Sequence, residues 1–158
     1  MIPDSRPIRA FLDDSHVAFA DAIGAFARGE FAGRPEPPDD AAARREARAM
    51  LETMGAGGWL DAIARQDWRS CCLAREALAA ASPLADAVFA LQALGTVPLL
   101  LAENAAMRER WVDEAVAGRA MAAFAMTERE AGSEVTAIAT TARREAGGYV
   151  LDGTKTYI

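Results

Sequence analysis

The sequence predicts a mainly α fold, with an N-terminal all-helical domain over residues 1–119 and the first strands of an incomplete β domain over residues 120–158. Apolar residues recur at helical spacing through most of the first segment. After Gly118 the pattern changes to that of short strands. The sequence stops inside an expected strand, and three or four strands with an open edge make a poor independent sheet. We therefore expect the β domain to be truncated.

The helical segment divides at capping residues, glycines and prolines. We expect helices over residues 8–28, 40–54, 68–81 and 84–94, a short helix capped by Thr96 with Pro98 in its first turn, and a helix over residues 105–117. Asp39 or Asp40 and Asp67 are the expected N-caps. Gly95 is expected to break the apolar helix. In the last helix, Met107, Trp111 and Val112 are expected to face inward.

Three strand segments are expected in the second part. They are residues 120–126, residues 139–144 and residues 149–158, the last read as a hairpin with Asp152-Gly153 as its tight turn.

Composition excludes several classes of function. A net charge of −6 and a pI near 4.8 argue against nucleic-acid binding. The apolar stretch 87–102 is interrupted by Gln92, Gly95 and Pro98, so it is not expected to cross a membrane. The start of the chain has no apolar signal core.

Cysteine and histidine usage points to a reducing, cytoplasmic setting without a metal centre. Cys71 and Cys72 are adjacent, lack metal-ligand spacing and suit free thiols. His16 is the only histidine, and we expect it to be a packed or solvated side chain rather than a catalytic base.

One stretch organises the rest of the chain. The apolar run 120–126 ends in Thr127 and a set of charged residues, followed by Gly132-Ser133. A strand that breaks into hydroxyls and a glycine leaves backbone N–H groups without ladder partners, and such groups bind anions. We expect this segment to hold a phosphate or the polar edge of a heterocycle.

The same residues carry a resemblance to a known family. The segment 124–134, FAMTEREAGSE, resembles the flavin-loop signature T-E-P-x-A-G-S-D of the acyl-CoA dehydrogenases. The segment 147–158, GGYVLDGTKTYI, is similar to that family's second signature, G-x-Y-x-L-x-G-x-K-x-W-I, at the usual separation. Leu94-Gly95-Thr96-Val97-Pro98 and the stretch from Arg110-Trp111 to Gly118 match its helical region. Arg129 and Glu134 depart from the signature's Pro and Asp.

The resemblance implies a helical domain, a β domain and a C-terminal helical bundle that together bind FAD. It assigns flavin contacts to Phe124, Met126, Thr127, Gly132, Ser133, Tyr157 and Ile158. Ser133 would also touch the pantetheine arm of the substrate, and Leu91, Leu94 and Gly95 would wall its acyl tail. For the last three residues, plain helix core is an equal reading.

The implied reaction is α,β-desaturation of an acyl thioester, carried by coenzyme A or a carrier protein, in fatty-acid metabolism. A carboxylate base is expected downstream of Ile158, so no catalytic residue is assigned, and Glu128, Glu130 and Glu134 are read as solvated or as capping N–H groups. The complete protein would be a homo-oligomer that passes electrons to an electron-transfer flavoprotein or another acceptor.

Two other classes stay open. One is an acyl-CoA oxidase on the same scaffold, which would differ in oxygen access to the flavin. The other is a non-catalytic helical module, or one half of a split enzyme, that binds an acyl chain or a partner protein.

Overall fold

The computed structural model describes residues 3–102 and 104–158, and the chain forms two compact units, Met1–Ala123 and Phe124–Ile158. The elements, in order, are η1 (Arg6–Phe11), α1 (Asp14–Phe31), α2 (Asp40–Ala56), α3 (Asp61–Ala64), α4 (Trp68–Ala81), α5 (Pro83–Leu101), α6 (Ala105–Val116), η2 (Val135–Ala137), β1 (Thr141–Glu145) and β2 (Gly148–Asp152), where η denotes a 3-10 helix. The predicted mainly α class is confirmed. The assignment of domains to residues 1–119 and 120–158 stays a prediction.

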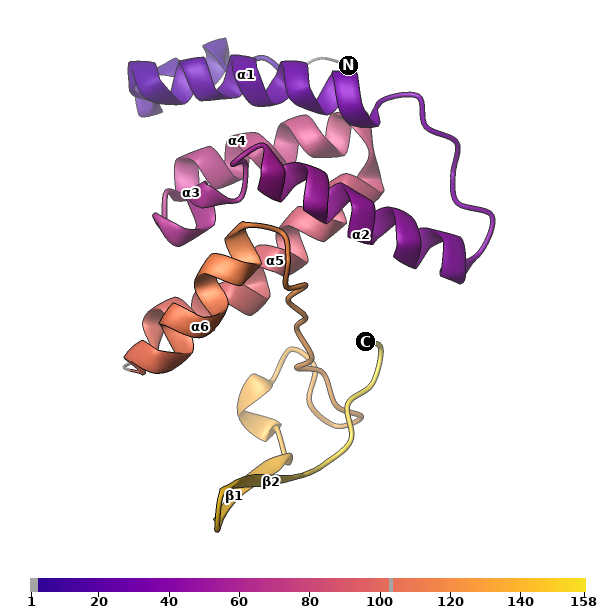
Figure 1. The fold of residues 1–158 in the computed structure, drawn as a ribbon, viewed down its shortest axis with the longest axis vertical. Helices are drawn as coiled ribbons and strands as arrows, with labels where there is room; N and C mark the ends of the chain where they lie inside the picture. The colour runs from indigo at the N-terminus through magenta and orange to yellow at the C-terminus, as the bar shows by residue number, and fades with distance from the viewer. Residues whose placement is uncertain (1–2, 103) are drawn as a thin grey trace. The chain divides into compact units, whose positions relative to one another are not determined.

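Helices α1 to α6 build the first unit around one apolar core. Helix α1 packs on α4, α4 packs on α5, and α5 also contacts α2 and α6 (Figure 1). The largest fully buried apolar side chains come from α1, α2, α4, α5 and the segment around α3: Ile23, Phe31, Met50, Leu51, Met54, Leu60, Ile63, Leu78 and Phe89. Burying each of these contributes about 1.5 to 3 kcal/mol to folding.

The first expected helix is two elements rather than one. Residues 6–11 form the 3-10 helix η1, the chain then extends at Leu12 and Asp13, and α1 begins at Asp14. The backbone N–H of Asp13 donates to Nδ1 of His16 at 3.1 Å, one half of a capping box, where the new helix starts. The periodicity crossed this boundary because apolar residues continue on both sides of it.

Two of the predicted helix caps are confirmed. The carboxylate of Asp39 accepts the backbone N–H of Ala42 at 2.7 Å and starts α2. The carboxylate of Asp67 accepts the N–H of Ser70 at 3.1 Å and starts α4. An N-cap of this kind stabilises its helix by about 1 kcal/mol.

The predicted break at Gly95 and the cap at Thr96 are wrong. Helix α5 runs without interruption from Pro83 to Leu101 with Pro98 inside it. Pro98 has no N–H, so the carbonyl of Leu94 loses its usual helical donor. Gly95 serves packing instead, because a Cβ built there would lie 2.6 Å from the Cβ of Ala122. Packing against neighbouring segments therefore outweighs the two local helix-breaking signals.

Because α5 continues through Gly95, it spans Pro83–Leu101 rather than the predicted residues 84–94. It is the one helix among residues 3–102 and 104–158 whose length and composition would let it cross a bilayer. This is weak evidence for a membrane segment, because an apolar core helix passes the same test. Ala85, Phe89, Gln92 and Thr96 on one face of α5 are buried in the first unit.

Helix α6 turns a narrower face inward than predicted. Val112 is buried, but Met107 and Trp111 are more than a third exposed. Gly118 ends this region with φ +72°, a left-handed conformation that favours glycine.

Two glycines allow the backbone of α2 to touch the turn after α6. A Cβ on Gly55 would lie 2.3 Å from the carbonyl group of Ala117, and a Cβ on Gly118 would lie 2.5 Å from the carbonyl oxygen of Leu51. Arg48 reinforces this crossing by donating to the carbonyl oxygen of Arg119 at 2.8 Å. No side chain could stand between the two segments here.

The second unit contains one antiparallel hairpin, in which β1 confirms most of the strand predicted over residues 139–144 and β2 the first part of the segment predicted over residues 149–158. Strand β1 pairs with β2 in a register that sets Thr141 opposite Asp152 and Glu145 opposite Gly148. The tight turn therefore lies at Ala146-Gly147, where Gly147 has φ +88°, and not at Asp152-Gly153. Residues 120–126 form no strand, and residues 153–158 extend beyond β2 without strand pairing.

Candidate functional site

The predicted flavin loop contains a tight turn in the second unit. The backbone N–H of Glu128 donates to the carbonyl oxygen of Ala131 at 2.9 Å, and the N–H of Ala131 donates back to Glu128 at 3.2 Å. Arg129 and Glu130 occupy the tip of this turn, with side chains 91% and 88% exposed. Arg129, which replaces the proline of the family signature, is thus compatible with a compact turn.

The carboxylate of Glu128 is the polar centre of the second unit. It accepts hydrogen bonds from the backbone N–H groups of Ala139 at 2.8 Å and Thr140 at 3.1 Å, and from the Thr140 hydroxyl. Its fourth partner is the ammonium group of Lys155, at 2.8 Å. Bonds from Lys155, from the Thr140 hydroxyl and from the Ala139 N–H lower the pKa of Glu128 to about 2. The sequence had predicted a solvated group or one that caps N–H groups, and the second of these holds for Glu128.

Residues 155 and 156 lie along the backbone of residues 126 and 127. The ammonium group of Lys155 also donates to the carbonyl oxygen of Met126 at 2.9 Å. The N–H of Thr156 donates to the carbonyl oxygen of Thr127 at 2.9 Å. The two segments that carry the family signatures are therefore in direct contact, 29 residues apart for Lys155 and Met126.

All the residues predicted to contact flavin lie in this second unit. Phe124 and Met126 are more than a third exposed, Thr127 is half-buried, and Gly132 and Ser133 are exposed. A Cβ built on Gly132 would meet no heavy atom within 4 Å, so open space surrounds this glycine. Tyr157, with φ +57°, is 97% exposed, and Ile158 is also exposed. Their contact with a cofactor stays a prediction.

The residues predicted to wall an acyl tail lie in the first unit, on α5. Leu91 and Leu94 are nearly half exposed, so helix core does not describe them. Gly95 lines a groove of about 250 Å³. The larger side chains of this groove are those of Thr96, Leu99, Met107, Trp111 and Met121. The groove is lined mainly by apolar atoms, which suits a hydrocarbon group.

Gln92 is a structural residue that the sequence reasoning missed. Its side chain is 1% exposed. Nε2 donates to the carbonyl oxygens of Ala115 and Ala120, and Oε1 accepts the N–H of Ala122, all at 2.8 Å. This amide holds the segment after α6 against α5. A lone polar residue inside a long apolar run was the available signal, because such residues are usually hydrogen-bonded when buried.

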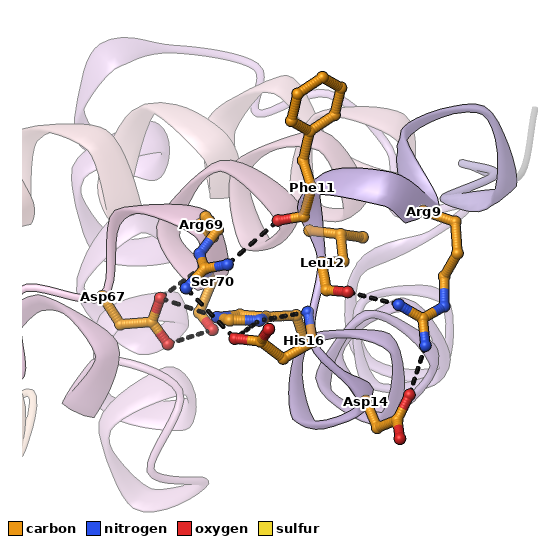
Figure 2. Close-up of polar contacts among 9 residues, drawn as sticks. Arg9, Phe11, Leu12, Asp14, His16, Asp67, Arg69 and Ser70 are labelled. Carbon is orange, nitrogen blue, oxygen red and sulfur yellow. Dashed lines mark hydrogen bonds and ion pairs between the residues drawn. The ribbon is translucent and has the colours of Figure 1, made fainter.

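His16, on α1, is buried and reaches α4, so of the two predicted states, packed or solvated, the packed one holds. Its Nδ1 accepts the backbone N–H of Asp13 at 3.1 Å, and its Nε2 lies 3.3 Å from a carboxylate oxygen of Asp67 (Figure 2). Burial opposes ionisation of Asp67, but bonds from Ser70 and from His16 together lower the pKa of that carboxyl below its usual range. Asp67 was not predicted as a partner, because 51 residues separate it from His16.

The polar cluster extends to η1. Arg69 on α4 donates to the carbonyl oxygen of Phe11 at 3.1 Å, which ties η1 to α4 (Figure 2). Within residues 3–102 and 104–158, no group of three His, Cys, Asp or Glu side chains is placed to hold a metal ion. The cluster around His16 joins η1, α1 and α4.

Known proteins resemble this chain over part of their length. No family model matches it. Benzylmalonyl-CoA dehydrogenase of Aromatoleum aromaticum is 46% identical over 88 residues, which cover 55% of this chain and 23% of that protein. The 3-(aryl)acrylate reductase of Clostridium sporogenes is 45% identical over 65 residues, covering 41% of this chain and 17% of that protein.

A third relative aligns over most of the chain. The probable acyl-CoA dehydrogenase FadE25 of Mycobacterium tuberculosis is 28% identical over 158 residues, which cover 93% of this chain and 39% of that protein. The chain thus spans less than two fifths of each of these three relatives. Over the matched part the chain is homologous to proteins named benzylmalonyl-CoA dehydrogenase and probable acyl-CoA dehydrogenase.

Proposed function

We propose that this chain supplies the helical domain and the flavin loop of an FAD-dependent acyl-CoA dehydrogenase. One observation carries the proposal: the two segments with the family signatures meet through Lys155, Met126 and Glu128. Similarity to relatives named as dehydrogenases of CoA thioesters supports the same reading.

The residues present fit a flavin. The carbonyl oxygens of Met126 and Thr127 are engaged by Lys155 and Thr156, so the loop backbone is fixed. The exposed backbone around Gly132 leaves room for a diphosphate, and the Thr127 hydroxyl can donate or accept. FAD would accept the β-hydrogen of the acyl group as hydride, while a protein carboxylate removes the α-proton.

The proposal assigns no base among the described residues. Glu128 has four hydrogen-bond donors and a pKa of about 2, so it is too weak a base to remove an α-proton at neutral pH. Glu130 and Glu134 are exposed to water, and hydrogen bonds from Thr136 lower the pKa of Glu134. We propose that the base is supplied by residues outside this sequence. In the same proposal, an electron-transfer flavoprotein or another acceptor takes up the electrons, and the complete protein is a homo-oligomer.

The substrate in this proposal is an apolar acyl group on coenzyme A or a carrier protein. Leu91, Leu94 and Gly95 would line the path of its tail, and Ser133 would contact its pantetheine arm. A cytoplasmic location is part of the same proposal.

Flavin absorbance tests the proposal. The chain of this sequence and the product of its complete reading frame are each purified, and absorbance near the flavin bands is recorded before and after anaerobic addition of acyl-CoA esters. We expect at least one preparation to bind flavin and to bleach with an acyl-CoA. Thr127→Val should weaken flavin binding, whereas Thr141→Val, an exposed threonine on β1, should not. Preparations that contain no flavin and take up none would refute the dehydrogenase and leave a binding module.

The relation to a 3-(aryl)acrylate reductase favours a second candidate, the reverse reaction. A reductase would re-oxidise its reduced flavin with an enoyl substrate and show little bleaching by saturated acyl-CoA. An oxidase would instead re-oxidise rapidly with oxygen and release hydrogen peroxide. The same anaerobic preparation, given each oxidant in turn, separates these outcomes.

A further inference from the structure

We propose that Lys155 and Glu128 are positioning residues that set the orientation of the Met126–Thr127 peptide group. The inference rests on the proposed function for its consequence, flavin binding, but its geometry belongs to the second unit alone.

The first step is the environment of Lys155. It is the only lysine of the chain, and its side chain is 25% exposed. Its ammonium group makes two contacts, with the carboxylate of Glu128 at 2.8 Å and with the carbonyl oxygen of Met126 at 2.9 Å. A hydrogen bond from a charged donor is about twice as strong as a neutral one. The carboxylate of Glu128 therefore fixes the ammonium group of Lys155, which in turn binds the carbonyl oxygen of the Met126–Thr127 peptide group.

The second step is the planarity of that peptide. In a trans peptide the carbonyl of Met126 and the N–H of Thr127 point in opposite directions. Because the carbonyl oxygen is directed toward Lys155, the Thr127 N–H is directed away from it. Among the hydrogen bonds of the described residues, this N–H has no acceptor. Turning the peptide over would break the contact with Lys155.

The third step is the support of Glu128. Three of its hydrogen bonds come from Ala139 and Thr140, so the carboxylate does not depend on Lys155 for its own placement. Glu128 thereby anchors Lys155 to the part of the chain that leads into β1. Loss of the Lys155 charge should free the Met126 carbonyl while leaving the contacts between Glu128 and the backbone in place.

The test compares Lys155→Met with Arg129→Met. Both changes remove one positive charge, but Arg129 is exposed at the tip of the turn and does not contact Met126. Two readouts are taken on each chain: the carbonyl ¹³C shift of Met126 by NMR, which needs no cofactor, and the dissociation constant for added FAD. The amide exchange of Ala139 reports whether the Glu128 contacts survive.

We expect Lys155→Met to move the Met126 carbonyl resonance and to weaken FAD binding about tenfold or more, as the loss of a charged hydrogen bond predicts. Exchange of the Ala139 amide should change less than about twofold in this variant. Lys155→Arg should restore part of the FAD affinity, because it keeps the charge and a donor. Arg129→Met should leave all three readouts at the values of the unchanged chain.

Two results would overturn the inference: an unmoved Met126 resonance in Lys155→Met, or FAD affinity in that variant equal to that of Arg129→Met. If the unchanged chain and its complete-frame product bind no FAD, the proposed function fails, and the Met126 resonance alone decides whether Lys155 orients the peptide. If Lys155→Met does not fold, Lys155→Gln carries the same comparison, since it keeps a donor without the charge.

Discussion

Replacing Gln92 by leucine should loosen the segment that follows α6. Leucine is close to glutamine in volume, so the change removes hydrogen bonds without leaving a large cavity. Three bonds of 2.8 Å are lost, to Ala115, Ala120 and Ala122. At about 1 kcal/mol each, with a partial offset from the more apolar side chain, the free energy of unfolding should fall by about 2 to 3 kcal/mol.

Urea denaturation measures this loss, and amide exchange locates it. With an m-value of about 2 kcal/mol/M, the midpoint should fall by roughly 1 to 1.5 M. The Ala122 amide, which donates to Gln92, should exchange faster than in the unchanged chain. Leu91→Met, at the neighbouring and half-exposed position, is the control and should stay within about 0.5 kcal/mol. A Gln92→Leu chain that matches this control in stability and in Ala122 exchange would refute the role given to the amide.

Three further outcomes are expected. Gly95→Ala should destabilise the first unit by about 1 to 3 kcal/mol in urea denaturation, although alanine favours helices, because its Cβ would lie 2.6 Å from that of Ala122; equal or greater stability would show that this contact can relax. Glu128 has a pKa of about 2 when folded, against an ordinary value of 4.5, so its contribution to stability is present above about pH 4.5 and declines as the pH falls toward 2. Glu128→Gln should therefore make the protection of backbone amides from exchange depend less on acid pH. An unchanged pH profile in this variant would contradict the stabilising role of the Glu128 carboxylate. Cys72 is exposed, whereas Cys71 is buried, and its burial, with a smaller effect of nearby charge, raises the pKa of its thiol to about 11. A thiol reagent should therefore label one cysteine in the folded chain and both in denaturant. Rapid labelling of both cysteines in the folded chain would contradict the packing of α4.

The sequence predicted those parts of the fold that depend on local chemistry. The predicted caps at Asp39 and Asp67 were correct because a capping carboxylate accepts the N–H of the residue three positions later, which local sequence can indicate. Gly95 and Pro98 misled, since both are local helix breakers whose effect is outweighed by packing along α5. The expected strand over residues 120–126 was wrong for a related reason: the N–H of Ala122 binds a side chain, and no neighbouring strand pairs with this segment.

The candidate site likewise has features that local sequence predicts and features that depend on tertiary structure. Its motif positions were readable from sequence, but the contacts of Lys155 with Met126 and Glu128 join positions 29 and 27 residues apart and depend on tertiary structure. Glu128 was expected to be solvated or to cap N–H groups, and the second holds, yet nothing in the sequence alone indicated that its donors would be Ala139 and Thr140. Periodicity and caps do not encode such distant pairs.

The crossing of α2 with the turn at Gly118 limits how this protein can change. At most packed positions a larger residue can be accommodated when a neighbour becomes smaller. Gly55 and Gly118 meet backbone atoms of Ala117 and Leu51, and backbone atoms cannot be made smaller by mutation. A variant that fails at either glycine should therefore have no second-site suppressor at its contact partners. In a genetic screen, recovery should come mainly from true revertants or from changes that stabilise the helical unit elsewhere.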